Sequence, residues 1–283
     1  ELRETKKFNK AIGTLGGGNH FIEVDVDEQD NKYLVIHTGS RNLGKQVADY
    51  YQNLAIQLCS GKEEIFKRKE EIIKTYKEQG RKSEIQKVLK ELEKEYKQNK
   101  PNLPNELCYL EGKYREQYLH DMKICQEYAS ENRTNIANQI IEKYFDIKFY
   151  EFDRFETIHN YISFEDNIVR KGAIRARKGE RVIIPINMRD GSIIAVGKGN
   201  EDWNNSAPHG AGRLMSRKKA KEMFKLEEFK ESMKDIYSTS VVEDTIDEAP
   251  FVYKPMKEII DNIQDTVEIE KIIKPIYNFK AKN

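Results

Sequence analysis

The chain has 283 residues and carries 49 Lys and Arg against 48 Asp and Glu, which gives a formal net charge of +1. This length excludes a disulfide- or metal-stabilised miniprotein and fits one large domain or two ordinary ones. Hydrophobic residues make up 38% of the chain and charged residues 34%, so a core can form and global disorder is excluded. The near-zero net charge neither indicates nor excludes binding to nucleic acid, because affinity for phosphates comes from local basic patches.

The sequence contains no membrane or export signal. No stretch approaches the ~20 apolar residues of a spanning helix, and residues 1–10 are charged rather than signal-like. We therefore expect a soluble, cytoplasmic protein with no membrane partner. The three cysteines, Cys59, Cys108 and Cys125, have no CxxC spacing, so neither a disulfide framework nor a structural zinc site is expected. Because the chain begins at Glu1 without Met, we expect a trimmed or incomplete version of a longer protein.

The first part of the chain predicts strands followed by a helix. Short runs rich in β-branched and aromatic residues predict strands at Phe21–Val26 and Tyr33–Ile36. Ser40 then precedes a segment of helical periodicity, Leu43–Leu58. Residues 62–100 predict two helices broken near Gly80, each with one apolar face and one face of Lys and Glu. This hairpin could be an RNA-binding arm, but Glu matches Lys almost one for one, which favours a solvated insertion.

The second part predicts a mixture of helices and strands. Helices are predicted at Leu119–Tyr144, Arg217–Phe229, Ser232–Tyr237 and Met256–Ile263, and strands at Lys148–Phe152, Arg181–Ile186 and Ser192–Val196. The last two strands flank a turn at residues 187–191 and so predict a hairpin. Since no repeat or linker divides the chain, we expect one compact α+β domain over residues 1–283. Its sheets would carry the active-site turns, with helices outside and residues 62–100 inserted as a charged helical hairpin.

Four of the five histidines lie in polar or glycine-rich motifs, whereas His120 lies in a helix-like segment and is taken as structural. The four are His20 in GGGNHFIE, His37 in IHTGSR, His159 in IHNY and His209 in SAPHGAGR. Imidazole is the commonest metal ligand, and glycine turns let backbone N–H groups approach an anion. The turn after His37 enters a predicted helix and also resembles a phosphate cradle. These motifs predict a metal-dependent enzyme that acts on phosphates.

His209 differs from the other three in its surroundings. Small residues enclose it, which predicts an accessible ring, and Arg213 and Arg217 follow at the start of a predicted helix. An accessible imidazole beside guanidinium groups suits a nucleophile that attacks phosphorus, because the incoming charge must be neutralised. A second metal-binding role or a general acid/base role fits these residues nearly as well.

Several long motifs occur in a fixed order along the chain. They are Gly16–Glu23, His37–Gly44, His159–Tyr161, Gly197–Asn200 and Ser206–Arg213. In these motifs the chain resembles the RtcB-type RNA-splicing ligases, from about Gly13 to the C-terminus, and the charged hairpin is the less diagnostic part. The resemblance implies an enzyme of tRNA splicing or RNA repair that uses GTP and two Mn²⁺ ions. It would join RNA ends bearing a 2′,3′-cyclic phosphate or 3′-phosphate to 5′-hydroxyl ends, and whether it needs an archease-like activator stays open.

The resemblance also implies roles for individual residues. His209 would attack the α-phosphate of GTP and hold GMP, and His20, His37 and His159 match the metal ligands. The residues that match the guanylate pocket are Asn19, His20, Phe21, Ile22, Glu23, His159, Asn160, Pro185, Ile186, Asn187, Met188, Ser192, His209, Gly210, Ala211, Gly212 and Lys280. The chemistry agrees, because Glu23 can accept from a purine N–H pair while Ser192 and Lys280 can donate to a carbonyl oxygen.

The sequence departs from the family pattern in one respect. An upstream Asp-x-x-Cys segment of the family supplies two further metal ligands, and no residue before Gly13 matches it. None of the three cysteines follows an Asp by three positions. We therefore expect a missing N-terminal portion and one poorly formed metal position. Two other functions remain open: a metal-dependent RNA phosphatase or cyclic phosphodiesterase, and an inactive guanine-nucleotide- or RNA-binding relative.

Overall fold

The computed structural model describes residues 5–99, 103–145 and 148–280. Two compact units are present in it: a helical unit of Asn42–Cys125 with the residues up to Phe8, and a sheet unit of Asn9–Arg41 with the residues from Gln126 onward. The predicted mixture of helices and strands is confirmed, so the chain is of the α+β class. Among the described residues, no helix is both long and apolar enough to cross a membrane.

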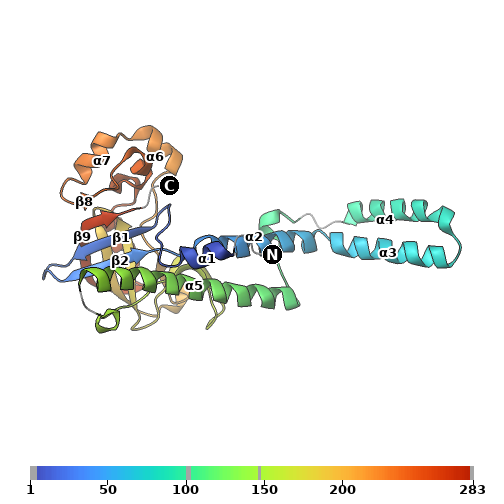
Figure 1. Ribbon diagram of the computed structural model, residues 1–283, viewed down its shortest axis with the longest axis horizontal. Helices are drawn as coiled ribbons and strands as arrows, with labels where there is room; N and C mark the ends of the chain where they lie inside the picture. The colour runs from blue at the N-terminus through green and yellow to red at the C-terminus, as the bar shows by residue number, and fades with distance from the viewer. Residues whose placement is uncertain (1–4, 100–102, 146–147, 281–283) are drawn as a thin grey trace. The chain divides into compact units, whose positions relative to one another are not determined.

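The helical unit contains the long helices of the first half of the chain. They are α2 (Arg41–Cys59), α3 (Lys62–Glu78), α4 (Ile85–Asn99) and the first part of α5 (Gly112–Tyr144). Helices α3 and α4 pack against each other as the predicted hairpin (Figure 1), and α3 ends beside Gly80, which has φ +74°. Lys100, the last residue of the predicted hairpin, lies outside the described residues. A short helix, α1 (Lys6–Ala11), precedes these elements.

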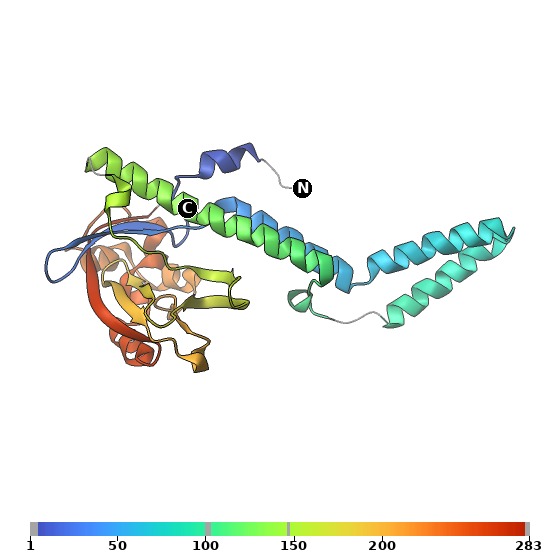
Figure 2. The ribbon, with the colours of Figure 1, turned by 90° about the horizontal axis from the view of Figure 1, so that it is seen from below.

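Helix α2 runs beside the first part of α5 within the helical unit (Figure 2). The Tyr51 hydroxyl donates to the Asp121 carboxylate at 2.8 Å, and the rings of Tyr51 and Tyr118 meet edge to face at 5.2 Å. The apolar spacing that predicts α2 also explains this packing, because Leu43, Val47 and Tyr51 fall on one buried face. The helix predicted over Leu43–Leu58 is therefore confirmed.

Two sheets form the sheet unit. Their strands are β1 (Phe21–Val26), β2 (Lys32–His37), β3 (His159–Ser163), β4 (Ile168–Arg175), β5 (Arg181–Asn187), β6 (Gly191–Gly197), β7 (Ser206–Pro208), β8 (Tyr237–Ser238) and β9 (Val267–Phe279). The larger sheet has the order β2-β1-β9-β6-β5, with β8 on β9, and the smaller has the order β3-β4-β7. All pairs are antiparallel except β8 with β9. The 13-residue strand β9 joins the β1–β2 hairpin to the β5–β6 hairpin.

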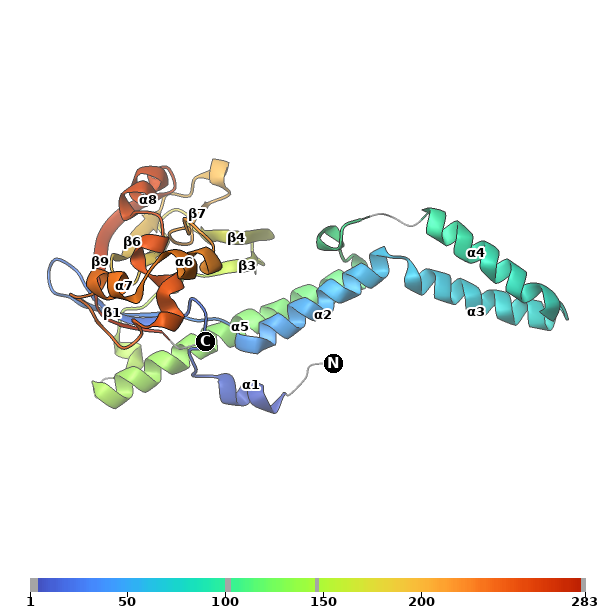
Figure 3. The same ribbon diagram turned by 90° about the horizontal axis from the view of Figure 1, so that it is seen from above.

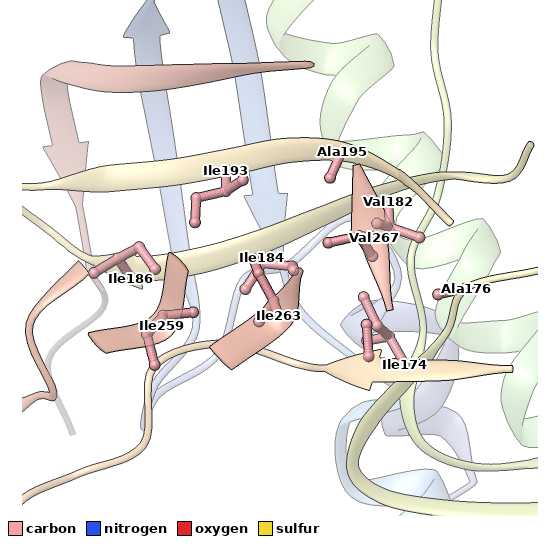
Figure 4. Close-up of a cluster of buried hydrophobic side chains, with 11 residues drawn as sticks. Ile174, Ala176, Val182, Ile184, Ile186, Ile193, Ala195, Ile259, Ile263 and Val267 are labelled. Carbon is pink, nitrogen blue, oxygen red and sulfur yellow. The ribbon is translucent and has the colours of Figure 1, made fainter. Parts of the chain in front are cut away.

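The core of the sheet unit lies between the β5–β6 hairpin and helix α8 (Met256–Ile263), which runs beside β9 (Figure 3). Alternate residues of β5 are buried, which is the pattern of a strand with one face in the core. Figure 4 shows Ile184 and Ile193 meeting Ile259 and Ile263 of α8, with Ile174 of β4 beside them. Each fully buried aliphatic side chain contributes roughly 1.5–3 kcal/mol of transfer free energy. This cluster fixes the strands from which the site residues project.

Three predicted elements are wrong in type or extent. Lys148–Phe152 was predicted to be a strand, but Phe149–Glu151 form one 3₁₀ turn. The cause is that no strand of the described residues pairs with this segment. Aromatic residues favour β-structure only where a neighbouring strand takes up the backbone hydrogen bonds. Here the Tyr150 side chain is 68% exposed, and the Arg154 guanidinium covers the Phe149 ring at 4.4 Å.

The single helix predicted at Arg217–Phe229 is two helices, α6 (Arg217–Met223) and α7 (Leu226–Ser232). The backbone is extended at Phe224, whose ring packs 4.2 Å from that of Phe251, and the Glu228 carboxylate then accepts the Lys225 N–H to start α7. The helix predicted at Ser232–Tyr237 is wrong as well, because α7 ends there and Tyr237–Ser238 pair with β9. Tertiary packing overrides helical periodicity in both places.

Candidate active site: a histidine cluster beside a polar pocket

The four histidines singled out in the sequence lie together in the sheet unit. His20 precedes β1, His37 ends β2, His159 begins β3 and His209 follows β7. Neighbouring ring centroids lie 5.8 Å apart for His20 and His37, 5.2 Å for His37 and His159, and 4.9 Å for His159 and His209. Residues distant in sequence therefore form one row of imidazoles, with His209 at one end. His120 lies in the helical unit, outside this row.

One buried asparagine of α5, Asn132, holds the glycine-rich turns that carry His20 and His37. Its side-chain oxygen accepts the Gly13 and Thr14 N–H groups at 2.8 and 3.1 Å. Its amide nitrogen lies 3.2 Å from the Gly39 carbonyl oxygen and 3.3 Å from the Thr38 hydroxyl. Nothing in the sequence pointed to Asn132, because a single Asn in a helix carries no motif. Asn132 therefore holds both loops in place, because it forms hydrogen bonds with loop N–H and carbonyl groups that no strand pairs.

Arg41 fills the space behind His20 rather than facing an open phosphate cradle. Its Nη1 atom donates to the Leu15 carbonyl at 3.1 Å and lies 3.3 Å from His20 Nδ1. Gly16 has φ +77°, a backbone conformation that favours glycine, and a Cβ on it would lie 1.3 Å from Arg41 Nη1, so a larger residue would displace the guanidinium. His20 Nδ1 itself lies 2.9 Å from the Leu15 carbonyl oxygen, to which it donates in the tautomer that leaves Nε2 with a lone pair.

Burial keeps the central histidines neutral. It lowers the pKa of His159 to about 4, and it lowers that of His37 well below the usual range, with a further lowering by the charge of His159. The pKa of His20 is also lowered by burial. Neutral rings can offer their lone pairs to a metal ion at neutral pH.

His37 and His159 present a pair of ring nitrogens that fits a shared cation. Their Nε2 atoms lie 3.1 Å apart, and two imidazole nitrogens bound to one tetrahedral ion stand about 3.4 Å apart. The described residues contain no group of three or more His, Cys, Asp or Glu side chains arranged to hold a metal ion. The predicted ligands are thus brought together as a pair, with the His20 ring edge-on to His37.

A polar pocket lies beside the cluster and collects most of the residues expected to bind a nucleotide. Its lining residues are Asn19, Phe21, Glu23, His37, Pro185, Ile186, Asn187, Met188, Gly191, His209, Gly210, Ala211, Glu248, Tyr253 and Lys280. Of the predicted set, His20, Ile22, His159, Asn160, Ser192 and Gly212 do not line it. Ile22 alternates with the buried Phe21 and Glu23 along β1, so its side chain faces the other side of the strand.

Asn160 and Ser192 differ from the pocket residues in their environments. The Asn160 side-chain oxygen accepts the Gly172 N–H at 2.9 Å, a bond that shapes the β3–β4 hairpin. Ser192 is fully buried beside Gly191, and its hydroxyl has no hydrogen-bond partner among the described residues.

The His209 turn is fixed against strand β5. The Ala211 N–H donates to the Pro185 carbonyl at 2.9 Å, and the His209 N–H donates to the Gly172 carbonyl at 3.4 Å. A Cβ on Gly210 would lie 2.8 Å from the Pro185 carbonyl oxygen, so only glycine allows this close approach. Pro185 is tolerated because β5 is an edge strand of its sheet. His209 is half-buried and borders the pocket, so the predicted open exposure of its ring is reduced.

A buried carboxylate that no sequence motif predicted, Glu248, pairs with the basic side chains on one side of the pocket. Glu248 Oε2 accepts from Lys280 Nζ at 2.8 Å and from the Tyr253 hydroxyl at 2.7 Å, and Glu248 Oε1 accepts from Arg217 at 2.8 Å and from Arg213. Arg213 and Arg217 therefore neutralise Glu248 and Asp247 instead of standing free for a phosphate as predicted. Burial raises the pKa of Tyr253, so its hydroxyl stays protonated and donates.

The pocket is narrow between these side chains. Its volume is about 80 Å³, whereas ligand pockets commonly measure about 300–1,000 Å³. The Lys280 amine lies 5.6 Å from the centre of the Phe21 ring while paired with Glu248. A purine base would therefore enter only if side chains such as Lys280 shift.

Glu248→Ala is expected to lower the free energy of unfolding by about 3–5 kcal/mol, because removing one partner of a buried ion pair leaves the other charges uncompensated. Urea denaturation would measure this change. Glu258→Ala is the matched control, since Glu258 pairs with Lys254 at a site where both side chains are 43% exposed. Such a surface pair contributes up to about 1 kcal/mol. Equal losses for the two variants would contradict the role assigned to Glu248.

The fold and the site define an α+β protein in which a row of histidines borders a polar pocket. The family model described as tRNA-splicing ligase RtcB matches residues 1–281. The chain therefore belongs to the RtcB family, as the motifs indicated.

Curated relatives agree with this membership. The RNA-splicing ligase RtcB of Escherichia coli K12 is 31% identical over 282 aligned residues, covering 92% of this chain and 59% of the relative. The tRNA-splicing ligases RtcB of Nanoarchaeum equitans and Aeropyrum pernix are 26% and 28% identical, covering 93% and 92% of this chain and 57% of each relative. The chain thus spans somewhat more than half the length of these relatives.

Proposed function

We propose that this chain carries the nucleotide-binding and nucleophilic part of an RNA ligase that joins 3′-phosphate or 2′,3′-cyclic phosphate ends to 5′-hydroxyl ends, with GTP and Mn²⁺ as cofactors. The observation that carries the proposal is the position of His209. It borders the polar pocket and lies beside the neutral His159 at the end of the histidine row. The names of the curated relatives point to the same RNA substrate class.

In this proposal the pocket binds guanine and presents the α-phosphate to His209. Glu23 is buried, and its pKa is raised well above the usual range by burial and then by the charge of Asp25. Guanine offers a pair of N–H donors, which would favour the ionised form of Glu23, so binding would release a proton. Lys280 would leave Glu248 to donate to the base, and its movement would also enlarge the narrow pocket.

His209 then acts as the nucleophile. A lone pair of its ring attacks the α-phosphorus of GTP, the bond to the bridging oxygen breaks, and pyrophosphate leaves. A 3′-phosphate oxygen of the RNA next takes GMP from His209 and frees the ring. The 5′-hydroxyl of the second RNA finally attacks the activated 3′-phosphate, forms the phosphodiester and expels GMP. A cyclic phosphate must first be opened by water to enter this sequence.

Mn²⁺ would supply charge neutralisation at the phosphates and polarise the phosphorus under attack. His37 and His159 are the residues best placed to hold it, because their neutral ring nitrogens lie 3.1 Å apart. Manganese also favours oxygen ligands, which the described histidine row lacks. His20 is the third candidate ligand, through the Nε2 atom that its contact with Leu15 leaves open.

The test uses the chain incubated with Mn²⁺ and α-labelled GTP, then denatured. An acid-labile, alkali-stable label on the protein, absent with α-labelled ATP, supports the proposal. The second part of the test asks whether the chain joins an RNA with a cyclic phosphate end to an RNA with a 5′-hydroxyl end. The same reaction with an archease-like activator added tests multiple turnover. Opening of the cyclic phosphate without any label would instead indicate a metal-dependent phosphodiesterase. Nucleotide binding without either reaction would indicate an inactive relative.

Replacing His37 or His159 with Ala is expected to weaken Mn²⁺ binding by at least about 10–100-fold. Mutating a residue that is only hydrogen-bonded to a metal ligand already causes a loss of this size. Equilibrium dialysis followed by elemental analysis would measure the bound metal, and circular dichroism would check the fold. His120→Ala is the control, because His120 lies outside the histidine row. Unchanged metal content in both variants would remove these two residues as ligands.

A further inference from the structure

Two of the three cysteines meet where the charged hairpin joins the helical unit. Cys59 is the last residue of α2, and Cys108 follows the short 3₁₀ helix at Asn105–Leu107. The Cys59 sulfur accepts the Tyr109 N–H at 3.4 Å, and its thiol lies 3.5 Å from the Tyr109 carbonyl oxygen. Helices α3 and α4 both lie in the chain between the two cysteines. The pair therefore sits where the hairpin begins and ends.

The two thiols are close to each other, because the Cys59 sulfur lies against the backbone of Tyr109, the residue that follows Cys108. Burial raises the pKa of Cys108, and the neighbouring Cys59 thiol raises it further. Both side chains are partly exposed free thiols. Cys125, by contrast, is buried, and burial raises the pKa of its thiol to about 11. Accessible thiolates are the reactive form of cysteine, so Cys125 is inert in the folded chain.

We propose that Cys59 and Cys108 form a reversible thiol-oxidation site, which small-molecule disulfides such as oxidised glutathione convert to an intramolecular disulfide. The Cys59 thiolate attacks the small disulfide, forms a mixed disulfide and releases one thiol. The Cys108 sulfur then attacks Cys59, forms the Cys59–Cys108 bond and releases the second thiol, which takes up the proton of Cys108. Two electrons pass to the oxidant, and the two protons of the cysteines end on the released thiols.

The surroundings assign the order of attack. The Cys59 sulfur accepts a hydrogen bond from the Tyr109 N–H, whereas the Cys108 thiol donates to the Pro104 carbonyl oxygen at 3.6 Å. A cavity of about 470 Å³ lies beside Cys59 and is lined also by Gly61, Tyr96 and Tyr109. The attacking sulfur thus borders open space, and Cys108, which does not line this cavity, is the resolving thiol.

The disulfide would close a covalent loop around α3 and α4. Such a link restricts the unfolded states of the enclosed segment. The ends of the α3–α4 hairpin should therefore stay together under conditions in which they would separate in the reduced chain. After proteolytic cleavage at Arg81, between the two helices, the fragments of the oxidised chain would remain joined until a reductant is added.

The test treats the intact chain with oxidised glutathione, blocks free thiols with a maleimide and maps the products by mass spectrometry. We expect one species two hydrogen atoms lighter, with the peptides of Cys59 and Cys108 linked, reversed by dithiothreitol. Cys108→Ser should accumulate glutathione on Cys59, and Cys59→Ser should be modified about tenfold more slowly. Cys125 should react only after denaturation.

Two results would overturn the proposal. One is a chain that keeps both thiols free under conditions that oxidise a simple dithiol such as reduced lipoamide. The other is a chain that carries two separate glutathione adducts, because the sulfurs would then not reach each other. Both readouts use the unmodified sequence, so a failure of either serine variant to fold leaves them intact. Neither involves GTP, Mn²⁺ or RNA, so the outcome is separate from the ligase proposal.

Discussion

His209→Ala is expected to abolish the covalent nucleotide label, because no other described histidine both borders the polar pocket and stands at the end of the histidine row. No label should be detectable, since the bond between nitrogen and phosphorus cannot form without the His209 ring. Nucleotide binding should survive, because Glu23 and Lys280 remain in place. Labelling with α-labelled GTP and equilibrium binding of GTP would measure the two properties separately.

The matched controls are His120→Ala and His159→Ala. His120→Ala should label like the parent chain, because its ring lies in the helical unit. His159→Ala should label weakly through loss of Mn²⁺ and should recover in part at higher Mn²⁺, whereas His209→Ala should not. A label that persists in His209→Ala would assign the nucleophile elsewhere and contradict the proposed function.

Much of the sheet unit could be predicted from short-range sequence pattern. Strand β1 and helix α8 have the predicted bounds, because alternation in Phe21–Val26 and helical spacing in Met256–Ile263 agree with the final packing. Strand β9 was not predicted. Its charged and apolar residues do not alternate regularly along the whole strand. Its conformation depends on pairing of its first half with β6 and of its second half with β1. Pairing over such sequence distances leaves no local signal.

The candidate site divides in the same way. His20, His37, His159 and His209 could be found because each stands in a glycine- or asparagine-containing turn whose backbone needs are visible in the sequence. Glu248 and Tyr253 could not, because they lie in a segment of short 3₁₀ turns without a motif. Only the folded chain brings Glu248 to Lys280 and the two arginines. The roles of Arg213 and Arg217 were misjudged for this reason.

Raising the pH from about 4 to about 8 is expected to destabilise the sheet unit, and Asp25→Asn is expected to remove much of that loss. Asp25 is fully buried on the same face of β1 as Glu23, and neither carboxylate oxygen has a hydrogen-bond partner among the described residues. Burial raises its pKa to about 7. The folded chain therefore binds a proton that the unfolded chain, with an ordinary Asp pKa of about 3.9, has already released.

The sign follows from this difference. Stability from the protonated Asp25 is fully present below about pH 4 and is lost as the pH rises through about 7. At about 1.4 kcal/mol per pKa unit, the loss is up to roughly 4 kcal/mol, and the raised pKa of Glu23 acts in the same direction. Urea denaturation of both chains at pH 4 and pH 8 would measure it. Asn at position 25 has no charge to bury, so its stability should fall less over this range.

Asp27→Asn is the control with the opposite sign. Hydrogen bonds from Asn31, and then from Tyr33 and backbone N–H groups, hold the pKa of Asp27 well below its usual range. Its stabilising effect is present above about pH 4 and is lost only on further acidification, so Asp27→Asn should destabilise the chain by about the same amount at both ends of the pH range used for Asp25. If Asp25→Asn kept the full pH dependence of the parent chain, the buried charge on β1 would not be its cause. An intact response to Asp27→Asn in the same experiment would show that the method can detect such a carboxylate.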